Sequence, residues 1–267
     1  MGTTWLFNVL RAIAYTSENP TFVVADGAPL PKKSWQGPII IKSHRADTPD
    51  LLDEYRPHIG ICAFVMLRDA QSTFASLLRT QSETPQTLLT WLDRDLRTYE
   101  VSLPHLQNVA SIREEWISTQ STNIIGRIST LLGWKIDTED AVEIASDYSK
   151  DSVRQRVKEL RQRNSWNGDF TNFDPDSQWH ANHISDGNYA IQDLDPDTHA
   201  ALANLQVRID ALTEKHSIWR QESFHDQESA CRAVDYVRER DARSRIHYSA
   251  LTRLRIKIRT RARRRLA

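Results

Sequence analysis

Three groups of polar residues stand where they could do chemistry. Gly2, Thr3 and Thr4 lead into an apolar-periodic segment, and such a turn offers backbone N–H groups and hydroxyls to an anion. Lys42–His44 follows the β-branched run "III", and Arg68 follows the apolar run "ICAFVML", with Ser76 eight residues later. Two cations could bind further anionic charge, and a histidine can take a proton near neutral pH. The set would suit a polyanionic nucleotide beside an acceptor hydroxyl.

The apolar segments before these groups predict the elements that position them. Continuous apolar runs at residues 21–24, 38–41 and 61–67 indicate strands, and helical spacing follows the last of them at Phe74, Leu77 and Leu78. Such strands followed by helices are typical of a parallel sheet covered on both faces. In open parallel α/β sheets, ligands bind beyond the carboxyl ends of the strands. We therefore expect the three polar groups to meet at that edge.

The second half of the chain predicts mainly helices around one weaker strand. Residues 165–200 are rich in Asn, Asp, Gly, His and Trp and lack periodicity, which is typical of a functional or mobile loop. Asp137 or Thr138 is expected to cap a helix, and Gly133 to end one. The predicted elements are a strand within 108–117, helices over 121–134, 137–164 and 197–216, and a polar helix over 217–245.

Length and charge indicate one large α/β domain with a basic tail. The 267 residues are enough for a single sizeable core, which we assign to residues 1–242. Residues 243–267 hold ten Arg or Lys and no acid, so the remainder carries 25 basic and 35 acidic residues. Three interpretations of this tail stay open: a disordered terminus, contact with an anionic membrane surface or polyanionic substrate, and, least favoured, nucleic acid.

Composition also bears on the compartment and on metals. No apolar run approaches the roughly 20 residues of a membrane helix, and residues 1–14 do not have the pattern of a signal peptide. The only cysteines, Cys62 and Cys231, form no metal or disulfide pattern, which favours a cytoplasmic location, with peripheral membrane attachment left open. His180 and His183 lie near Asp186 but lack a third ligand at a recognisable spacing, so no metal is expected.

Several motifs, in order along the chain, resemble the sulfotransferases that use 3′-phosphoadenosine 5′-phosphosulfate (PAPS). "GTTWL" resembles the family's 5′-phosphosulfate loop, and "IIIKSHR" resembles its strand ending in Lys-Thr-His, with Ser43 in place of Thr. "VMLRDAQSTFASLL" resembles the 3′-phosphate motif, an Arg and a Ser eight positions apart. The segment from "VASIREEWI" to "LLGW" is similar to a later strand and helix of the family. The resemblance covers about residues 1–195 and implies a P-loop NTPase-like three-layer fold with a central parallel sheet.

The resemblance also implies a role for each matching residue. Lys42 would neutralise charge on the sulfonyl group, and His44 would deprotonate the acceptor hydroxyl. The family's closing loop, Arg-Lys-Gly-x-x-Gly, has "NHISDGNYAIQDL" as its candidate, where His183 and Gly187 are comparable but the Arg-Lys pair is absent. The remaining implied contacts are Gly2, Thr3 and Thr4 with the 5′-phosphosulfate, Trp5 with adenine, and Arg68 and Ser76 with the 3′-phosphate.

The start of the sequence departs from the family pattern. The family precedes Gly-Thr-Thr with a strand, then Pro, Lys or Arg, and a small residue; Met1 takes the small residue's place. We therefore expect the first strand and the loop's cation to be missing from this sequence. Three explanations stay open: a start assigned some tens of residues too late, a degenerate or non-catalytic relative, or positive charge supplied by the terminal amine, which is largely protonated below a pKa of about 8.

The function expected from the resemblance is transfer of a sulfonyl group from PAPS to a hydroxyl or amine of a small-molecule, glycan or lipid acceptor. One alternative is a catalytically impaired nucleotide-binding relative. A P-loop kinase is disfavoured, because no Gly-Lys-Ser/Thr and no clear Mg²⁺ carboxylate accompany the loop. At some positions a purely structural role is the alternative to ligand binding. Thr3 and Thr4 could cap a helix, Trp5 could be a core aromatic residue, and Ser76 could be an ordinary helical serine.

Overall fold

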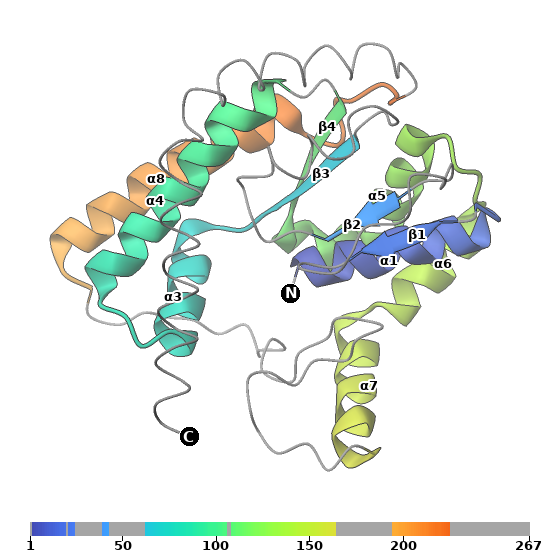
Figure 1. Ribbon diagram of the computed structural model, residues 1–267, viewed down its shortest axis with the longest axis horizontal. Helices are drawn as coiled ribbons and strands as arrows, with labels where there is room; N and C mark the ends of the chain where they lie inside the picture. Colours follow the sequence, from blue (N-terminus) through green and yellow to red (C-terminus); the bar gives the residue numbers. More distant parts are fainter. Residues whose placement is uncertain are drawn as a thin grey trace, which may run out of the picture.

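The computed structural model of the chain describes residues 2–19, 21–24, 39–42, 62–105, 108–163 and 194–224. These residues contain both helices and parallel strands, as an α/β fold requires (Figure 1). The elements are α1 (Gly2–Thr16), β1 (Phe22–Val24), β2 (Ile39–Ile41), β3 (Cys62–Leu67), α3 (Ala70–Thr80), α4 (Pro85–Ser102), the 3₁₀ helix η1 (Leu103–His105), β4 (Asn108–Arg113), α5 (Glu114–Leu132), α6 (Thr138–Asp147), α7 (Lys150–Arg163) and α8 (Pro196–His216).

The described strands pair in parallel. β1 pairs with β2, from Phe22 opposite Ile39 onward. β3 pairs with β4 over six residues, from Cys62 opposite Asn108 to Leu67 opposite Arg113. Parallel strands need long crossover connections, and α3 and α4 lie on the connection from β3 to β4. The parallel arrangement predicted from the apolar runs is confirmed.

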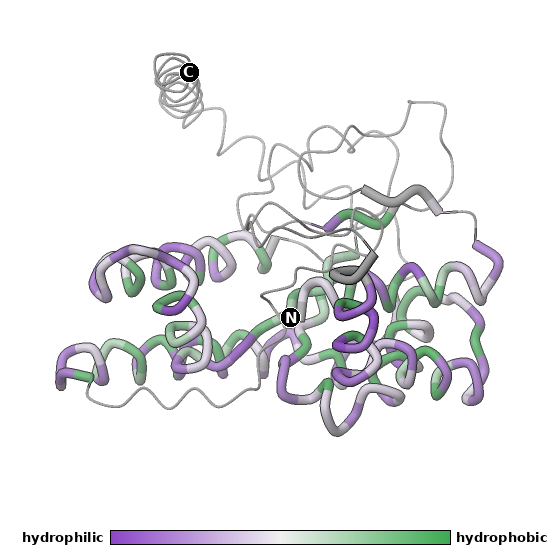
Figure 2. Tube along the Cα trace, turned by 90° about the horizontal axis from the view of Figure 1, so that it is seen from below, coloured by the Kyte–Doolittle hydropathy of each residue, from purple (hydrophilic) through white to green (hydrophobic). Residues whose placement is uncertain are grey.

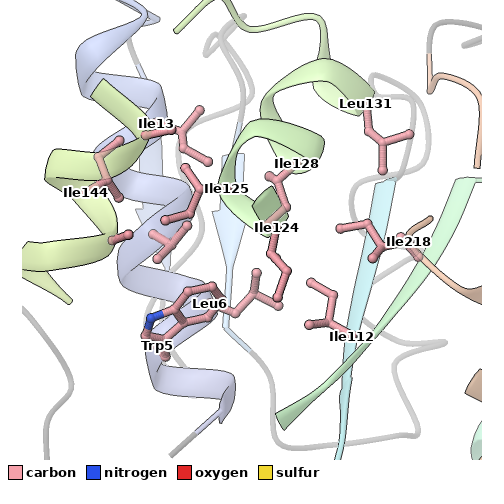
Figure 3. Packing of buried hydrophobic residues seen from close by; sticks show 14 of the residues in the cluster. Trp5, Leu6, Ile13, Ile112, Ile124, Ile125, Ile128, Leu131, Ile144 and Ile218 are labelled. Carbon is pink, nitrogen blue, oxygen red and sulfur yellow. The ribbon is translucent and has the colours of Figure 1, made fainter. Parts of the chain in front are cut away.

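Helices cover both faces of β3 and β4, because the strand residues alternate between two cores. On one face, Val65, Leu67 and Val109 pack with residues of α3, α4 and α8. On the other, Ala110 and Ile112 pack with α1, α5 and α6, where isoleucines of α5 fill the space between α1 and the strands (Figure 3). The chain therefore has three layers, a parallel sheet between two layers of helices.

Local sequence signals set several helix ends. Asp137 caps α6 in a reciprocal capping box with Asp140, and Gly133 ends α5 in the left-handed conformation, which costs glycine little. Asp69 and Asp195 cap α3 and α8 by accepting backbone N–H groups. Hydrophobic and hydrophilic residues alternate along these helices (Figure 2), so each has an apolar side for the core.

Several elements differ from the sequence-based expectations. The strand expected within 108–117 ends at residue 113, where α5 follows, and the helix expected over 137–164 is divided into α6 and α7. α4, an 18-residue helix, is not among the elements predicted from the sequence. Residues 217–224, predicted as the start of a polar helix, are not helical: Ser217 bridges Ser111 of β4, and the N–H of Ile218 donates to the Ser111 carbonyl at 3.0 Å. Ile218 is fully buried, so burial of this apolar residue beside the sheet outweighs the helical preference of its neighbours. Within the described ranges, none of the helices is both long and apolar enough to span a bilayer.

Candidate functional site

The carboxyl ends of β3 and β4 bring together two segments far apart in the sequence. Leu67 and Arg113 are opposite each other in the last pair of the ladder, so the residues after them, Arg68 and Glu114, are neighbours across the sheet. Arg68 Nε lies 3.8 Å from Glu114 Oε2, and both side chains are about a quarter exposed, at 24% and 25%. We call this place, defined by Arg68, Arg113, Glu114 and the start of α3, the β3–β4 edge.

A second arginine at this edge is nearly buried. The Arg113 side chain is 10% exposed. Its Nε donates to Glu115 Oε1 at 2.6 Å, and its Nη1 donates to Asp210 Oδ1 of α8 at 2.9 Å. Two carboxylates thus compensate a guanidinium that would otherwise be costly to bury.

α3 carries Ser76 away from the edge. Asp69 accepts the N–H of Ser72 at 2.7 Å, and the N–H of Ala70 is also bonded, to the side chain of Gln206 of α8 at 2.8 Å. The hydroxyl of Ser76, a partly exposed residue, has no hydrogen-bond partner among the described residues. The N–H groups of Ala70 and Ser72 are therefore already bonded, and the Arg68 guanidinium and the Ser76 hydroxyl are among the groups that this region could offer an anion.

The other predicted site residues that the structure describes lie on α1 and at the end of β2, which we call the α1–β2 side. α1 begins at Gly2, so the glycine and the two threonines lie in its first turn and not in a loop that precedes the helix, as was expected from the resemblance. Thr4 and Trp5 are buried, at 6% and 3% exposure. Lys42 directly follows β2 and is 4% exposed.

Trp5 packs in the hydrophobic core. Its ring lies beside Leu6 and below Ile124 and Ile125, with the indole nitrogen on the side away from Ile112 (Figure 3). That nitrogen is buried without a hydrogen-bond partner among the described residues. The position of Trp5 fits the core interpretation, and it also fits the contact with adenine that the resemblance implies. A buried N–H without a partner either destabilises the fold or is the place where a ligand binds.

The structure places some predicted site residues and not others. Arg68 and Ser76 lie at the entry and in the body of α3, and Lys42 follows a strand, as expected. His44, His183 and Gly187 lie outside the described residues, as do His180 and Asp186. Four residues near Arg68 were not among those predicted from the sequence: Arg113, Glu114, Gln206 and Asp210. A signal existed for Arg113 and Glu114, since charged residues end an apolar strand there, but none existed for the two residues of α8.

A separate ionic cluster joins α4 and α8. Arg208 donates to both carboxylate oxygens of Glu100 at 2.7 Å and to Asp93 at 2.6 Å. These hydrogen bonds from Arg208 lower the pKa values of Asp93 and Glu100 and raise that of Arg208. Elsewhere, burial raises the pKa of the Cys62 thiol to about 11, so this cysteine is not a reactive thiolate.

A comparison with solved structures finds a similar fold. The chain resembles the crystal structure of mouse sulfotransferase SULT7A1 complexed with PAP, with a TM-score of 0.54 at 14% sequence identity, over 80% of this chain and 84% of that chain. No protein-family model matches the sequence, and no curated protein matches it. At this identity the likeness establishes the fold: a P-loop-like α/β fold with a parallel sheet flanked by helices.

Proposed function

We propose that the protein is a sulfotransferase that moves a sulfonyl group from PAPS to a hydroxyl or amine of an acceptor. The observation that carries this proposal is that Arg68 at the β3–β4 edge and Ser76 farther along α3 belong to a fold shared with a sulfotransferase complexed with PAP. PAP, adenosine 3′,5′-bisphosphate, is what PAPS becomes when the sulfonyl group leaves.

Arg68 and Ser76 would hold the 3′-phosphate. A guanidinium forms short, charge-assisted hydrogen bonds with phosphate oxygens, and the partly exposed side chain of Arg68 has Glu114 as a neighbour at 3.8 Å. A phosphate carries more charge than a carboxylate and would compete well for that guanidinium. A serine hydroxyl adds a neutral donor. The pair therefore distinguishes a 3′-phosphate from a 3′-hydroxyl.

The α1–β2 side would hold the other end of the nucleotide. Gly2, Thr3 and Thr4 lie in the first turn of α1, where backbone N–H groups favour an anion. Trp5 would contact adenine, and His183 and Gly187 would belong to the loop that closes over the nucleotide. No metal is required in this arrangement, because backbone dipoles and cations neutralise the phosphosulfate.

The chemistry would be an in-line displacement at sulfur. The acceptor oxygen forms a bond to sulfur while the bond from sulfur to the 5′-phosphate oxygen breaks, and the acceptor proton passes to His44. Lys42, at the end of β2, would offset negative charge on the transferring group. Such transfer depends mainly on positioning and charge neutralisation.

Calorimetry with PAP and adenosine 5′-phosphate tests the binding half of this proposal, and release of PAP from PAPS tests the catalytic half. We expect PAP to bind at least about tenfold more tightly, because the 3′-phosphate adds charge-assisted hydrogen bonds. Equal affinities would overturn the proposal. PAP preference without turnover, measured over a panel of phenol, sugar, lipid and amine acceptors, would identify a nucleotide-binding relative, and turnover of ATP alone would indicate a kinase.

We also propose that residues 243–267 attract anionic surfaces and that the protein acts in the cytoplasm, partly at the membrane. This segment holds ten Arg or Lys residues and no Asp or Glu. Each basic residue near an anionic bilayer contributes about 1 kcal/mol of binding free energy. Cosedimentation with phosphatidylserine vesicles should exceed that with phosphatidylcholine vesicles and fall in high salt. If a chain ending at residue 242 binds each kind of vesicle as well as the full chain does, this assignment is contradicted.

A further inference from the structure

α8 reaches across the fold to the first residue of α3. Gln206 Oε1 accepts the backbone N–H of Ala70 at 2.8 Å, although the two residues are 136 positions apart. The first N–H groups of a helix have no partner inside the helix, and Ala70 is only 2% exposed. Gln206 therefore satisfies a donor that water does not easily reach.

The orientation of the Gln206 amide is fixed by its other end. Its Nε2 donates to Asp210 Oδ1 at 2.8 Å, and the same oxygen accepts from Arg113 Nη1 at 2.9 Å. With the amide turned over, an oxygen would face the Asp210 carboxylate and an N–H would face the N–H of Ala70. Only the observed orientation satisfies both partners.

These bonds form a relay that joins four elements at the β3–β4 edge. It runs from the start of α3 through Gln206 and Asp210 of α8 to Arg113 at the end of β4, and Arg113 continues to Glu115 in the first turn of α5. Arg113 is nearly buried, at 10% side-chain exposure, so the relay is anchored in the folded core although Asp210 itself is exposed.

We propose that Gln206 is a positioning residue for the 3′-phosphate site, an inference that rests on the proposed function. Arg68 lies two residues before Ala70 and Ser76 six residues after it. At 1.5 Å of rise per residue, Ser76 is about 9 Å along α3 from the tethered N–H. If the start of α3 can shift, the Arg68 guanidinium and the Ser76 hydroxyl change their relative position. A single phosphate can bind both groups only when their separation stays nearly constant.

The experiment uses the full chain and three variants. Gln206→Met keeps the length of the side chain and removes its acceptor and donor. Asp210→Asn leaves the acceptor for Ala70 in place but removes the charge that orients it. Glu100→Gln is the matched control, because it breaks the Arg208 cluster between α8 and α4 and leaves the relay intact. Each protein is titrated with PAP and with adenosine 5′-phosphate, and the amide exchange of Ala70 is followed by NMR.

The relay predicts a loss of selectivity. Gln206→Met should weaken PAP binding about fivefold, the scale of one lost hydrogen bond, while adenosine 5′-phosphate changes by less than about twofold. The Ala70 amide should exchange faster, because its acceptor is gone. Asp210→Asn should weaken PAP binding about twofold and leave the affinity for adenosine 5′-phosphate nearly unchanged. Glu100→Gln should keep the wild-type ratio of the two affinities.

The outcomes separate this inference from the proposed function. Wild-type protein without a preference for PAP would overturn the proposed function and this inference together. A wild-type preference that survives unchanged in Gln206→Met and Asp210→Asn would overturn the positioning role alone. An equal loss of preference in Glu100→Gln would also overturn it, because general loosening of α8 would then explain the effect.

Discussion

The side chains of the α1–β2 side are more deeply buried than those at the β3–β4 edge and on α3. Thr4, Trp5 and Lys42 are at most 6% exposed. Arg68 keeps 24% of its side chain exposed, and Ser76 is partly exposed. Substitutions on the α1–β2 side should therefore cost stability first, whereas those at the β3–β4 edge should cost ligand affinity.

The physical reason for this contrast is the kind of support that each part receives. α1 packs its apolar face on α5 and α6, so its first turn is held by contacts that bury side chains. The β3–β4 edge is held by hydrogen bonds among Arg113, Asp210, Gln206 and the α3 backbone. A polar relay can fix geometry while leaving the neighbouring guanidinium accessible to a ligand.

The largest effect is expected from Trp5→Ala. Removing a large aromatic side chain from a core costs about 3–5 kcal/mol, which urea unfolding would measure. Trp5→Phe, which keeps a ring and removes an N–H that has no partner in the described structure, should cost less than about half as much. A small stability loss in Trp5→Ala together with an equal loss of affinity for PAP and for adenosine 5′-phosphate, which share the adenine, would instead place the ring against adenine and contradict the contrast.

His44→Ala tests the proposed general base. If His44 is the general base, turnover should fall by about 10²-fold or more while PAP affinity stays within a few-fold, because the proton moves only in the transition state. Steady-state release of PAP at saturating acceptor measures this. Near-full activity in the variant would assign the base to another residue.

Arg68→Ala tests the β3–β4 edge. It should weaken PAP binding by about 1.5–3 kcal/mol, the range for hydrogen bonds to charged groups, and affect adenosine 5′-phosphate much less. Its melting temperature should stay close to that of the wild type, because the side chain is partly exposed and ion pairs near the surface contribute little to stability. Equal losses for the two nucleotides would rule out the 3′-phosphate assignment.

The smallest effect is expected from the Arg208 cluster, which lies outside both parts. Hydrogen bonds from Arg208 lower the pKa values of Glu100 and Asp93, so the folded state binds the protons of these carboxyls less readily than the unfolded state. Their stabilisation is therefore complete at neutral pH and is lost as the pH falls below about 4. The stability difference between wild type and Glu100→Gln should shrink over that range.

Urea unfolding between pH 3 and pH 7 measures this difference. Glu83→Gln, at an exposed position before α4, is the matched control and should show little change at any pH. A difference between wild type and Glu100→Gln that is the same at pH 3 as at pH 7 would contradict the role of the ionic cluster.

Much of the fold could be predicted from local patterns. The apolar run of β3 and the helical spacing after it gave the strand and α3, and Asp137 and Gly133 end their helices as predicted. α4 was missed, although Thr84 and Pro85 form a regular N-terminus for it. The segment after His216 was wrongly predicted as helix, because its contact with β4 through Ser111 is non-local.

The sequence by itself determined which residues follow the strands and which residues begin the helices, since these depend on neighbours a few positions away. It therefore predicted Arg68 at a strand end and Ser76 within the next helix. Only the tertiary structure decided that Trp5 is buried in the core, that Glu114 lies beside Arg68, and that Gln206 bonds to Ala70. The burial of Trp5 depends on how α1 packs against α5 and α6, and the other two contacts depend on how β3, β4, α3 and α8 pack. Contacts between residues so far apart in the chain leave no periodic signal in the sequence.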